Sequence, residues 1–586
     1  MATHKYVKDY PRPQFVREKW LSLNGEWDFK FDDENRGEGE KWYEQFNGAL
    51  KIKVPYTYET KMSGIGEEAF HPYVWYQRML EVPKENADQR AILNFQAVDY
   101  IAKLWVNGVY VGEHQGGYTA FSFDITPYLQ LDAPNTLVVK AEDSQSCTQP
   151  RGKQRWVDDN FECFYVQTTG IWQSVWLEYV SPSHLKAVKI TPDLDARSVR
   201  FEYQTQAVSK LNQLRLETRI RIHNKMIKQT SLVIDRPWLQ LDVDLSHEAN
   251  GPWKIVTWSP HQPNLYEVEF ILYQDNVVVD HVYSYFGIRK ISIEKGKVLL
   301  NNTPFYQRLI LDQGYWPESH LTPQSEEALI EDIDAIIAMG YNGVRKHMKI
   351  EDARFLYWCD VKGLLVWSEM AATFEFNDEA VENFTKEWME IVRQQYNHPS
   401  IVTWVPFNES WGIPQVLTDG KQQKFTESIY HLTKSFDPHR PVIVNDGWEH
   451  TVSDILTLHD YEETGAKLLK RYADKDALVN GEISFNNWKY AIAQGYAYNG
   501  QPVIVSEFGG IAFNTGTGWG YGNQVDSEEE FIERFRSITQ AIKDTDYICG
   551  YCYTQLSDVQ QEVNGLLTAD RKPKVPLEII KEINLA

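Results

Sequence analysis

Residues 401–411 read IVTWVPFNESW, an apolar run of strand length that leads into Asn408 and Glu409. Residues 502–510 read PVIVSEFGG, a second apolar run that leads into Glu507. Uninterrupted apolar runs of this length are typical of strands buried on both faces of a parallel sheet. The two stretches therefore indicate an α/β domain in which two strands each deliver a glutamate to one edge of the sheet.

Strand-length apolar runs alternate with amphipathic helices from Gly287 onward. The clearest helix follows Ser325, a suitable N-cap residue, and its apolar residues recur at helical spacing. The expected strands are residues 305–311, 343–347, 364–370, 401–408, 441–446, 455–461, 502–508 and 548–555. Eight strands alternating with helices predict a (β/α)8 barrel, whose active site lies at the C-terminal ends of its strands.

The sequence before the barrel consists of short β-forming runs separated by turn residues. Asn107-Gly108 lies between two such runs and predicts a β-hairpin. Further on, runs such as 199–203 and 214–218 alternate with period two, over a segment as long as an immunoglobulin-like domain. We therefore expect three domains, namely a β-sandwich at residues 1–182, an immunoglobulin-like β-sandwich at 183–288 and a catalytic barrel at 289–586.

Composition narrows the range of partners. A formal net charge of −23 disfavours nucleic acid and anionic membranes, and no apolar run is long enough for a transmembrane helix. Aromatic residues make up 13% of the chain, which suits stacking against sugar rings as well as β-sandwich cores. Met1–Gln14 lacks the apolar region of a signal peptide, and five cysteines suggest a reducing compartment, so we expect a cytoplasmic protein. The chain is also compatible with a homo-oligomer.

The two strand-end glutamates predict acid–base and nucleophilic chemistry. Glu409 and Glu507 lie on the fourth and seventh expected strands, so they can face each other across a substrate. Carboxyl groups roughly 5–5.5 Å apart hydrolyse a glycosidic bond with retention of configuration. That reaction needs one carboxylate that stays ionised and one carboxyl group that retains a proton.

Other strand-end residues are expected to contact the substrate. Asn408 can bind a sugar hydroxyl, Arg345 can keep a carboxylate ionised, and Tyr461 can donate a hydrogen bond to it, although Arg345 also fits a structural ion pair and Tyr461 a core aromatic. The remaining polar strand-end residues, which the sequence does not rank, are Asp312, Lys346, His347, Glu369, Asp446, His459, Asp460 and Gln555.

From this set we select His347 and Asp312 as substrate contacts. We also select Trp448 and Trp519 from the candidate stacking platforms, which are Trp411, Trp448, Trp519 and Tyr521. No His, Asp and Glu cluster has convincing metal-ligand spacing. Cys549 and Cys552 would point to opposite faces of a strand, so neither a metal nor a cofactor is expected.

At these residues the sequence resembles glycoside hydrolase family 2. Asn397-His398-Pro399-Ser400 through Asn408-Glu409 resembles the family's acid/base signature, and Ser506-Glu507-Phe508-Gly509 resembles its nucleophile segment. Residues 23–27, 105–108 and 169–172 resemble markers of its N-terminal jelly-roll domain. The resemblance implies that Glu409 is the acid/base, that Glu507 is the nucleophile, and that residues 1–182 form a jelly-roll, sugar-binding-like domain.

Departures from the family bear on the substrate. Residues 565–574 resemble the β-glucuronidase ending, but Glu562-Val563-Asn564 replaces the Asn-x-Lys that grips a glucuronate carboxylate there. A glutamate at that position should repel a uronate. Residues 311–316 also lack the Arg-His-Glu pattern of common β-galactosidases, so no metal site is carried over.

We therefore expect a retaining exo-β-glycosidase that acts on the terminal neutral sugar of an oligosaccharide or glycoside, in the manner of a β-galactosidase. The alternatives are a β-glucuronidase or other uronidase, an arabinosidase or galactofuranosidase, and a non-catalytic carbohydrate-binding protein.

Overall fold

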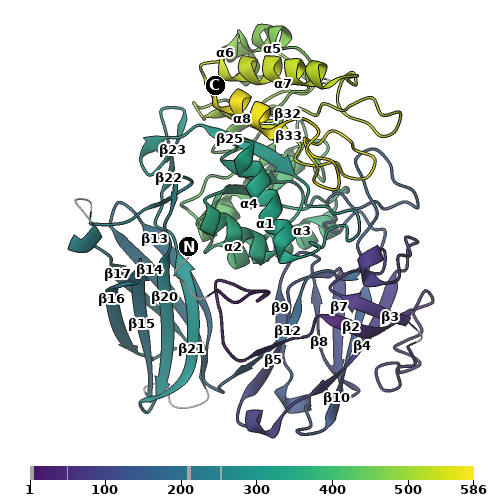
Figure 1. Ribbon diagram of the computed structural model, residues 1–586, viewed down its shortest axis with the longest axis vertical. Coiled ribbons are helices and arrows are strands. Elements are labelled where there is room, and N and C mark those ends of the chain that lie inside the picture. Colours follow the sequence, from purple (N-terminus) through teal and green to yellow (C-terminus); the bar gives the residue numbers. More distant parts are fainter. Residues whose placement is uncertain (1–5, 49, 208–212, 251–253, 487) are drawn as a thin grey trace.

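A computed structural model describes residues 6–586 except 49, 208–212, 251–253 and 487. Two β-sandwiches lie side by side, and both contact one α/β domain above them (Figure 1). Each of the three parts has its own buried apolar cluster. The expected architecture of two sandwiches and a barrel is confirmed.

The first sandwich packs an antiparallel four-stranded sheet on a six-stranded one. In sheet order, the smaller sheet comprises β1 (Trp20–Ser22), β12 (Val175–Val180), β5 (Arg90–Phe95) and β9 (Phe121–Asp124). The larger comprises β3 (Leu50–Val54), β2 (Gly25–Phe31), β4 (Tyr73–Glu81), β10 (Pro134–Glu142), β7 (Ile101–Val106) and β8 (Val109–Gln115). The predicted hairpin joins β7 to β8, with positive φ angles of 51° at Asn107 and 77° at Gly108.

The second sandwich packs three strands on four. One sheet comprises β13 (His184–Asp193), β14 (Ser198–Gln206) and β17 (Trp238–Asp244), and the other comprises β16 (Lys225–Val233), β15 (Leu214–Ile222), β20 (Tyr266–Gln274) and β21 (Val277–Phe286). The alternating runs at 199–203 and 214–218 lie within β14 and β15. Their inward residues form the apolar cluster between the sheets.

In the part that the structure describes, the α/β domain consists of parallel strands and eight helices. Its sheet order is β28 (Ile401–Val405), β27 (Leu365–Glu369), β26 (Gly343–Lys346), β25 (Gln307–Asp312), β33 (Ile548–Thr554), β32 (Val503–Gly509) and β31 (Leu456–His459). The helices are α1 (Glu326–Ala338), α2 (Ala353–Lys362), α3 (Asp378–Gln395), α4 (Gly420–Phe436), α5 (Gly465–Tyr472), α6 (Lys475–Val479), α7 (Glu528–Lys543) and α8 (Leu577–Leu585). As expected, the Ser325 side chain caps α1 by accepting a hydrogen bond from the Ala328 N–H.

The fifth barrel strand is shorter than expected. Only β30 (Asn445–Asp446) is regular, and it pairs with β29 (Phe407–Asn408), whereas Val442 makes an isolated bridge to Trp404. The first strand begins at Gln307 rather than at residue 305. The other strands lie within or overlap the expected ranges.

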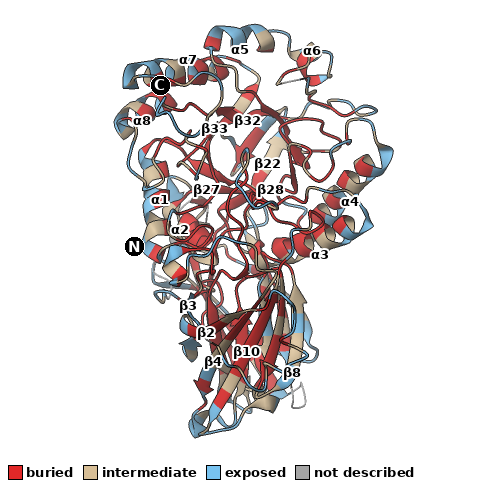
Figure 2. Ribbon diagram, turned by 90° about the vertical axis from the view of Figure 1, so that its right-hand side faces the viewer, coloured by how far each residue is buried: buried red, intermediate tan, exposed pale blue. Residues whose placement is uncertain are grey.

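Alternation along each barrel strand separates an inner from an outer face. Leu309, Leu365 and Trp367 belong to the cluster inside the barrel, whereas Ile310 and Val344 belong to the cluster beneath the helices. Figure 2 shows the buried strands at the centre and exposed residues on the outer sides of helices such as α4 and α5. The same alternation decides which polar strand-end residues enter the site. No helix in the described part of the chain is both long and apolar enough to cross a bilayer.

Candidate active site

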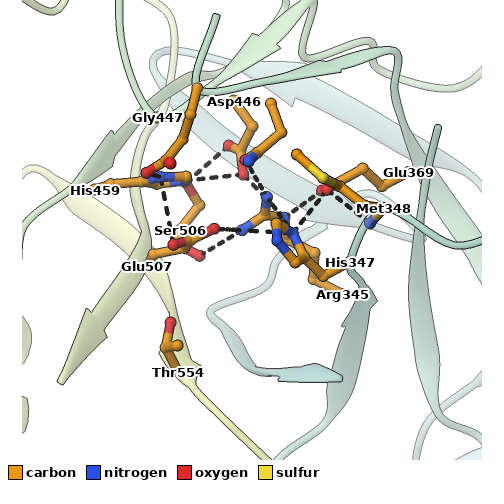
Figure 3. A network of polar contacts seen from close by, with 12 residues as sticks. Arg345, His347, Met348, Glu369, Asp446, Gly447, His459, Ser506, Glu507 and Thr554 are labelled. Carbon is orange, nitrogen blue, oxygen red and sulfur yellow. Dashed lines mark hydrogen bonds and ion pairs between the residues drawn. The ribbon is translucent and has the colours of Figure 1, made fainter. Parts of the chain in front are cut away.

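Arg345 is the centre of a buried charged cluster at the C-terminal ends of the barrel strands (Figure 3). Its side chain is 0% exposed. Its Nη1 lies 2.7 Å from Glu507 Oε1, and its Nε lies 2.6 Å from Glu369 Oε2 and 2.9 Å from Asp446 Oδ2. Its Nη2 donates to Asn408 Oδ1 at 2.6 Å. One guanidinium group therefore binds groups from four different strands.

His459 connects the two glutamates. Its Nδ1 lies 2.8 Å from Glu409 Oε1 and 3.5 Å from Glu507 Oε2, while its Nε2 lies 3.2 Å from Asp446 Oδ2. One atom of each of Glu409, His459 and Glu507 lies within 4.8 Å of the others. This separation is close to that of the carboxyl pair in retaining glycosidases, roughly 5–5.5 Å.

The chain makes a tight turn to present Glu409. Glu409 and Ser410 follow β29 with positive φ angles of 52° and 61°, a conformation that non-glycine residues rarely adopt. Hydrogen bonds hold the turn, because the Ser410 N–H donates to Asn445 Oδ1 at 2.9 Å and its hydroxyl donates to Glu449 Oε2 at 2.6 Å. Strained backbone that is fixed in this way is concentrated at functional sites.

Charged neighbours shift the pKa values of Glu507 and His459 in opposite directions. Burial alone would raise the pKa of Glu507, but His459 and Arg345 outweigh it and lower this pKa to about 2. Burial would lower the pKa of His459, whereas Glu507 and Asp446 raise it to about 10. The Tyr461 hydroxyl donates a further hydrogen bond to Glu507 Oε2. At neutral pH, Glu507 is thus an ionised carboxylate beside a protonated imidazole.

Glu369 and His347 support Arg345 from the other side. His347 Nδ1 lies 2.8 Å from Glu369 Oε1, which also accepts the Met348 N–H at 3.0 Å. Burial raises the pKa of Glu369 to about 7 although Arg345 opposes this shift. The pKa of His347 lies well below its usual value because of burial and the nearby Lys153 and Arg345 charges.

The proximity of Glu409, His459 and Glu507 could suggest a metal site. A ligating imidazole must be neutral, whereas both ring nitrogens of His459 carry protons and face carboxylates. The donor chemistry of this trio therefore fits an ion-pair network better than a metal centre.

The structure brings most of the expected site residues together. Arg345, Asn408, His347 and Tyr461 join the two glutamates in the cluster. Trp448 lies edge-on to His459, with ring centroids 5.5 Å apart. Trp519 is more distant, because it packs against Tyr521, which in turn stacks on Tyr461.

Asp312 lies apart from this cluster. Its carboxylate is 2.5 Å from Lys346 Nζ, which also pairs with Glu351 at 2.7 Å. On β26 the Arg345 side chain enters the site, whereas the next residue, Lys346, points to the outer face of the barrel and contacts the Phe355 ring. Asp460 similarly pairs with Arg471 of α5. Asp312 thus belongs to a separate ion-pair network with Lys346 and Glu351, whereas Asp460 holds α5 to the barrel.

Some residues of the site come from outside the barrel. The loop of residues 147–168, here called the sandwich loop, leaves the first sandwich and lies across the barrel mouth. The Arg151 N–H donates to Ala372 O at 2.9 Å, the Phe374 N–H donates to Cys147 O at 2.9 Å, and Trp519 Nε1 donates to Glu162 O at 2.9 Å.

Lys153 of this loop is buried, and its Nζ donates to Cys163 Sγ at 3.1 Å. Neither Lys153 nor Cys163 could be predicted as a site residue, because both belong to a β domain remote in sequence from the catalytic strands.

Glu562 contacts the strand-end residue Gln313 and forms a separate corner of the site. Its Oε2 accepts hydrogen bonds from the Tyr165 hydroxyl and, at 3.1 Å, from Gln313 Nε2, and its Oε1 accepts one from Asn564 Nδ2 at 3.0 Å. This carboxylate is therefore held by three donors from three different segments of the chain.

Comparison with known proteins identifies the same family along nearly the whole chain. Three family models match consecutive stretches: the sugar binding domain of glycosyl hydrolases family 2 over residues 20–180, the model named glycosyl hydrolases family 2 over 183–289, and its TIM barrel domain over 291–585.

Among curated relatives, a β-galactosidase from Thermoanaerobacter pseudethanolicus is 28% identical over 75% of this chain, but the match spans only 57% of that protein. A β-glucuronidase from Rattus norvegicus is 25% identical over 96% of this chain and 90% of its own length. The crystal structure of a Ruminococcus gnavus β-glucuronidase shares the fold, with a TM-score of 0.79 and 18% identity over 97% of this chain and 98% of that chain. With three family models covering almost its whole length, this chain belongs to glycoside hydrolase family 2 and is a glycoside hydrolase.

Proposed function

We propose that the protein is a retaining exo-β-glycosidase in which Glu507 is the nucleophile and Glu409 is the general acid/base. The observation that carries this proposal is the pair of carboxyl groups, with one oxygen of each within 4.8 Å of the other at the ends of barrel strands. The short separation leaves room for a sugar between them but not for an additional attacking water, as retention requires.

The surroundings assign the two roles. Glu507 is 5% exposed and is surrounded by Arg345, His459 and Tyr461, which keep it anionic and ready to attack the anomeric carbon. Glu409 is 19% exposed and has only His459 as a side-chain partner among the described residues. Its more open position suits a group that protonates the departing oxygen and then deprotonates the incoming water.

For the sugar, we propose a terminal β-glucuronide as the leading substrate class. Relatives matched over nearly the whole chain, including those from Rattus norvegicus and Streptococcus agalactiae, are named β-glucuronidases. The match to the β-galactosidase is shorter. The similarity thus favours the uronide over the neutral sugar that the sequence motifs alone suggest.

A neutral β-glycoside is the second candidate, because of Glu562. Its buried carboxylate lies in the corner of the site, where it would repel a uronate. The two candidates make opposite predictions for a panel of aryl glycosides at equal concentration. We expect nitrophenyl β-D-glucuronide to give the highest kcat/KM, and a higher value for a galactoside or arabinoside would replace the glucuronide by the neutral sugar.

Variants of the two glutamates test the mechanism. Glu507→Ala should abolish turnover, and Glu409→Ala should lose at least about 10³-fold in kcat with an aryl glycoside and recover with added azide, which needs no general base. Glu294→Ala, an exposed carboxylate on β22 (Ile291–Glu294), is the control. Wild-type activity in either variant would refute the assigned roles, and sugar binding without any turnover by the native protein would indicate a binding protein instead.

A further inference from the structure

Lys153 is a buried ammonium group that lacks an anionic partner. The residue is 8% exposed, and no carboxylate oxygen of the described residues lies within 4.0 Å of its Nζ. Among the described residues, its one hydrogen-bond acceptor is the Cys163 sulfur, which is a weak acceptor. A buried charge with two of its three donors unused is costly unless a ligand supplies the missing acceptor.

The fold fixes the position of this charge. The residue before it, Gly152, has a φ of 60° and approaches the barrel so closely that a Cβ there would lie 2.4 Å from Met348 O. The N–H groups of Arg151 and Gly152 both donate to Ala372 O, at 2.9 and 3.2 Å. On its other side, Lys153 O accepts the Tyr165 N–H at 2.9 Å. The backbone of Lys153 is therefore held by the barrel and by its own loop.

The charge of Lys153 acts on the catalytic cluster. It lies near enough to lower the pKa of His347, and Glu562 and Glu409 are among the groups that raise its own pKa. Glu562 does not neutralise it at contact distance, because the Glu562 oxygens accept from Tyr165, Gln313 and Asn564 instead. Lys153 thus keeps donors that no carboxylate of the described residues occupies.

We infer that Lys153, carried to the barrel mouth by the sandwich loop, binds the carboxylate of a β-linked uronic acid and determines the preference for uronides over neutral sugars. The inference rests on the proposed function, which supplies the glycosidase site. A carboxylate matches a buried ammonium in charge and offers several lone pairs, whereas a hydroxyl offers no compensating charge. The inference also explains how a chain with Glu562 in this corner can still accept a uronide.

The experiment compares kcat/KM for nitrophenyl β-D-glucuronide and for the matching β-D-galactoside. In Lys153→Met, the ratio of the two values should fall about 100-fold, as expected for loss of a charged hydrogen bond. Lys153→Arg should recover part of the ratio, and the exposed Lys186→Met should leave it unchanged. An equal loss on both substrates, or a greater loss on the galactoside, would refute the inference.

A calorimetric measurement covers the case of an unstable variant. D-glucuronate should bind the native protein at least about 10-fold more tightly than D-glucose does, and Lys153→Met should abolish this difference. Equal binding of the two sugars by the native protein would overturn the inference without any variant. If instead no glycoside is hydrolysed although glucuronate binds preferentially, the proposed catalytic function fails and the role of Lys153 stands.

Discussion

At the scale of single residues, the site is organised around two buried cations. Arg345 and His459 lie between Glu369, Asp446, Glu507 and Glu409, and each cation contacts more than one carboxylate. A buried charge is costly unless it is paired, and the loss of either cation would leave several carboxylates without compensation. The same pairing fixes the geometry of Glu507 before any substrate arrives, which is the arrangement that stabilises developing charge most efficiently.

Tyr461→Phe tests the hydrogen bond to Glu507 with minimal disturbance. The ring stays stacked on Tyr521, with centroids 3.4 Å apart, while the hydroxyl that donates to Glu507 is lost. We expect kcat/KM to fall roughly 10- to 100-fold, the equivalent of about 1.5–3 kcal/mol for a hydrogen bond to a charged group. Tyr521→Phe keeps the same stack and should retain activity. Equal activity losses in the two variants would indicate that the Tyr461 hydroxyl has no specific role at Glu507.

Strand-end residues were predictable from the sequence only in part. Runs such as IVTWV and PVIVS placed Glu409 and Glu507 at the barrel mouth, because the carboxyl ends of parallel strands meet there. His459 was one of several unranked polar residues, since its importance depends on carboxylates from three other strands. Asp312 pairs with Lys346 apart from the catalytic cluster, because a shift of one residue along a strand turns a side chain to the opposite face.

At the scale of elements, the sandwich loop makes the first sandwich part of the active site. Trp156 stacks on Phe374 with centroids 4.6 Å apart, and Asn160 Nδ2 donates to Gln560 Oε1 at 2.6 Å. Gln561 Nε2 in turn donates to the carbonyls of Glu162 and Phe164, at 3.0 and 2.9 Å. These contacts tie one wall of the site to two separate barrel loops. The wall could not be predicted from the sequence, because no local pattern reports which domain a loop will lie against.

Gly152→Ala tests whether the position of this loop matters for activity. A Cβ at Gly152 would lie 2.4 Å from Met348 O, so the loop must move and displace Lys153 with it. We expect kcat/KM on the preferred glycoside to fall at least about 10-fold, since small misplacements of binding groups reduce catalysis strongly.

Gly64→Ala is a matched control for that variant. Gly64 lies in the same sandwich and has a φ of 87°, but a Cβ there would meet nothing within 4 Å. Both variants should lose about 1 kcal/mol or more of stability to backbone strain, measured by denaturant unfolding, whereas only Gly152→Ala should lose activity. Similar kinetics in the two variants would mean that the loop tolerates displacement.

At the scale of the whole molecule, the pattern of apolar and polar residues predicted the architecture of two β-sandwiches and a barrel. Period-two alternation predicts β14 and β15, because one face of each strand is buried between the sheets. Uninterrupted apolar runs predict the barrel strands, because both faces of those strands are buried. The substrate was less predictable from the sequence. Two residues that bear on it, Glu562 and Lys153, lie 409 residues apart in the chain. Their relation depends on how two domains pack.

Buried carboxyl groups also set how the stability of the whole protein responds to pH. Burial raises the pKa of Glu59 and that of Glu387 from 4.5 to about 8. Between these values the folded state binds more protons than the unfolded state, so the free energy of unfolding falls as pH rises, by up to about 1.4 kcal/mol per pH unit for each group. His459, raised from 6.5 to about 10, contributes in the same direction above pH 6.5.

Between pH 6.5 and 8 these groups act together, because the buried His320 and His450, with pKa values lowered from 6.5 to about 4, have the opposite effect only below pH 6.5. We therefore expect a lower apparent Tm at pH 8 than at pH 6.5. Glu59→Gln cannot ionise and should reduce this difference, whereas the exposed Glu294→Gln should not. Thermal unfolding of the three proteins at both pH values is the measurement. A Tm that rises with pH over this range, or an unchanged difference in Glu59→Gln, would show that Glu59 does not retain its proton in the folded protein.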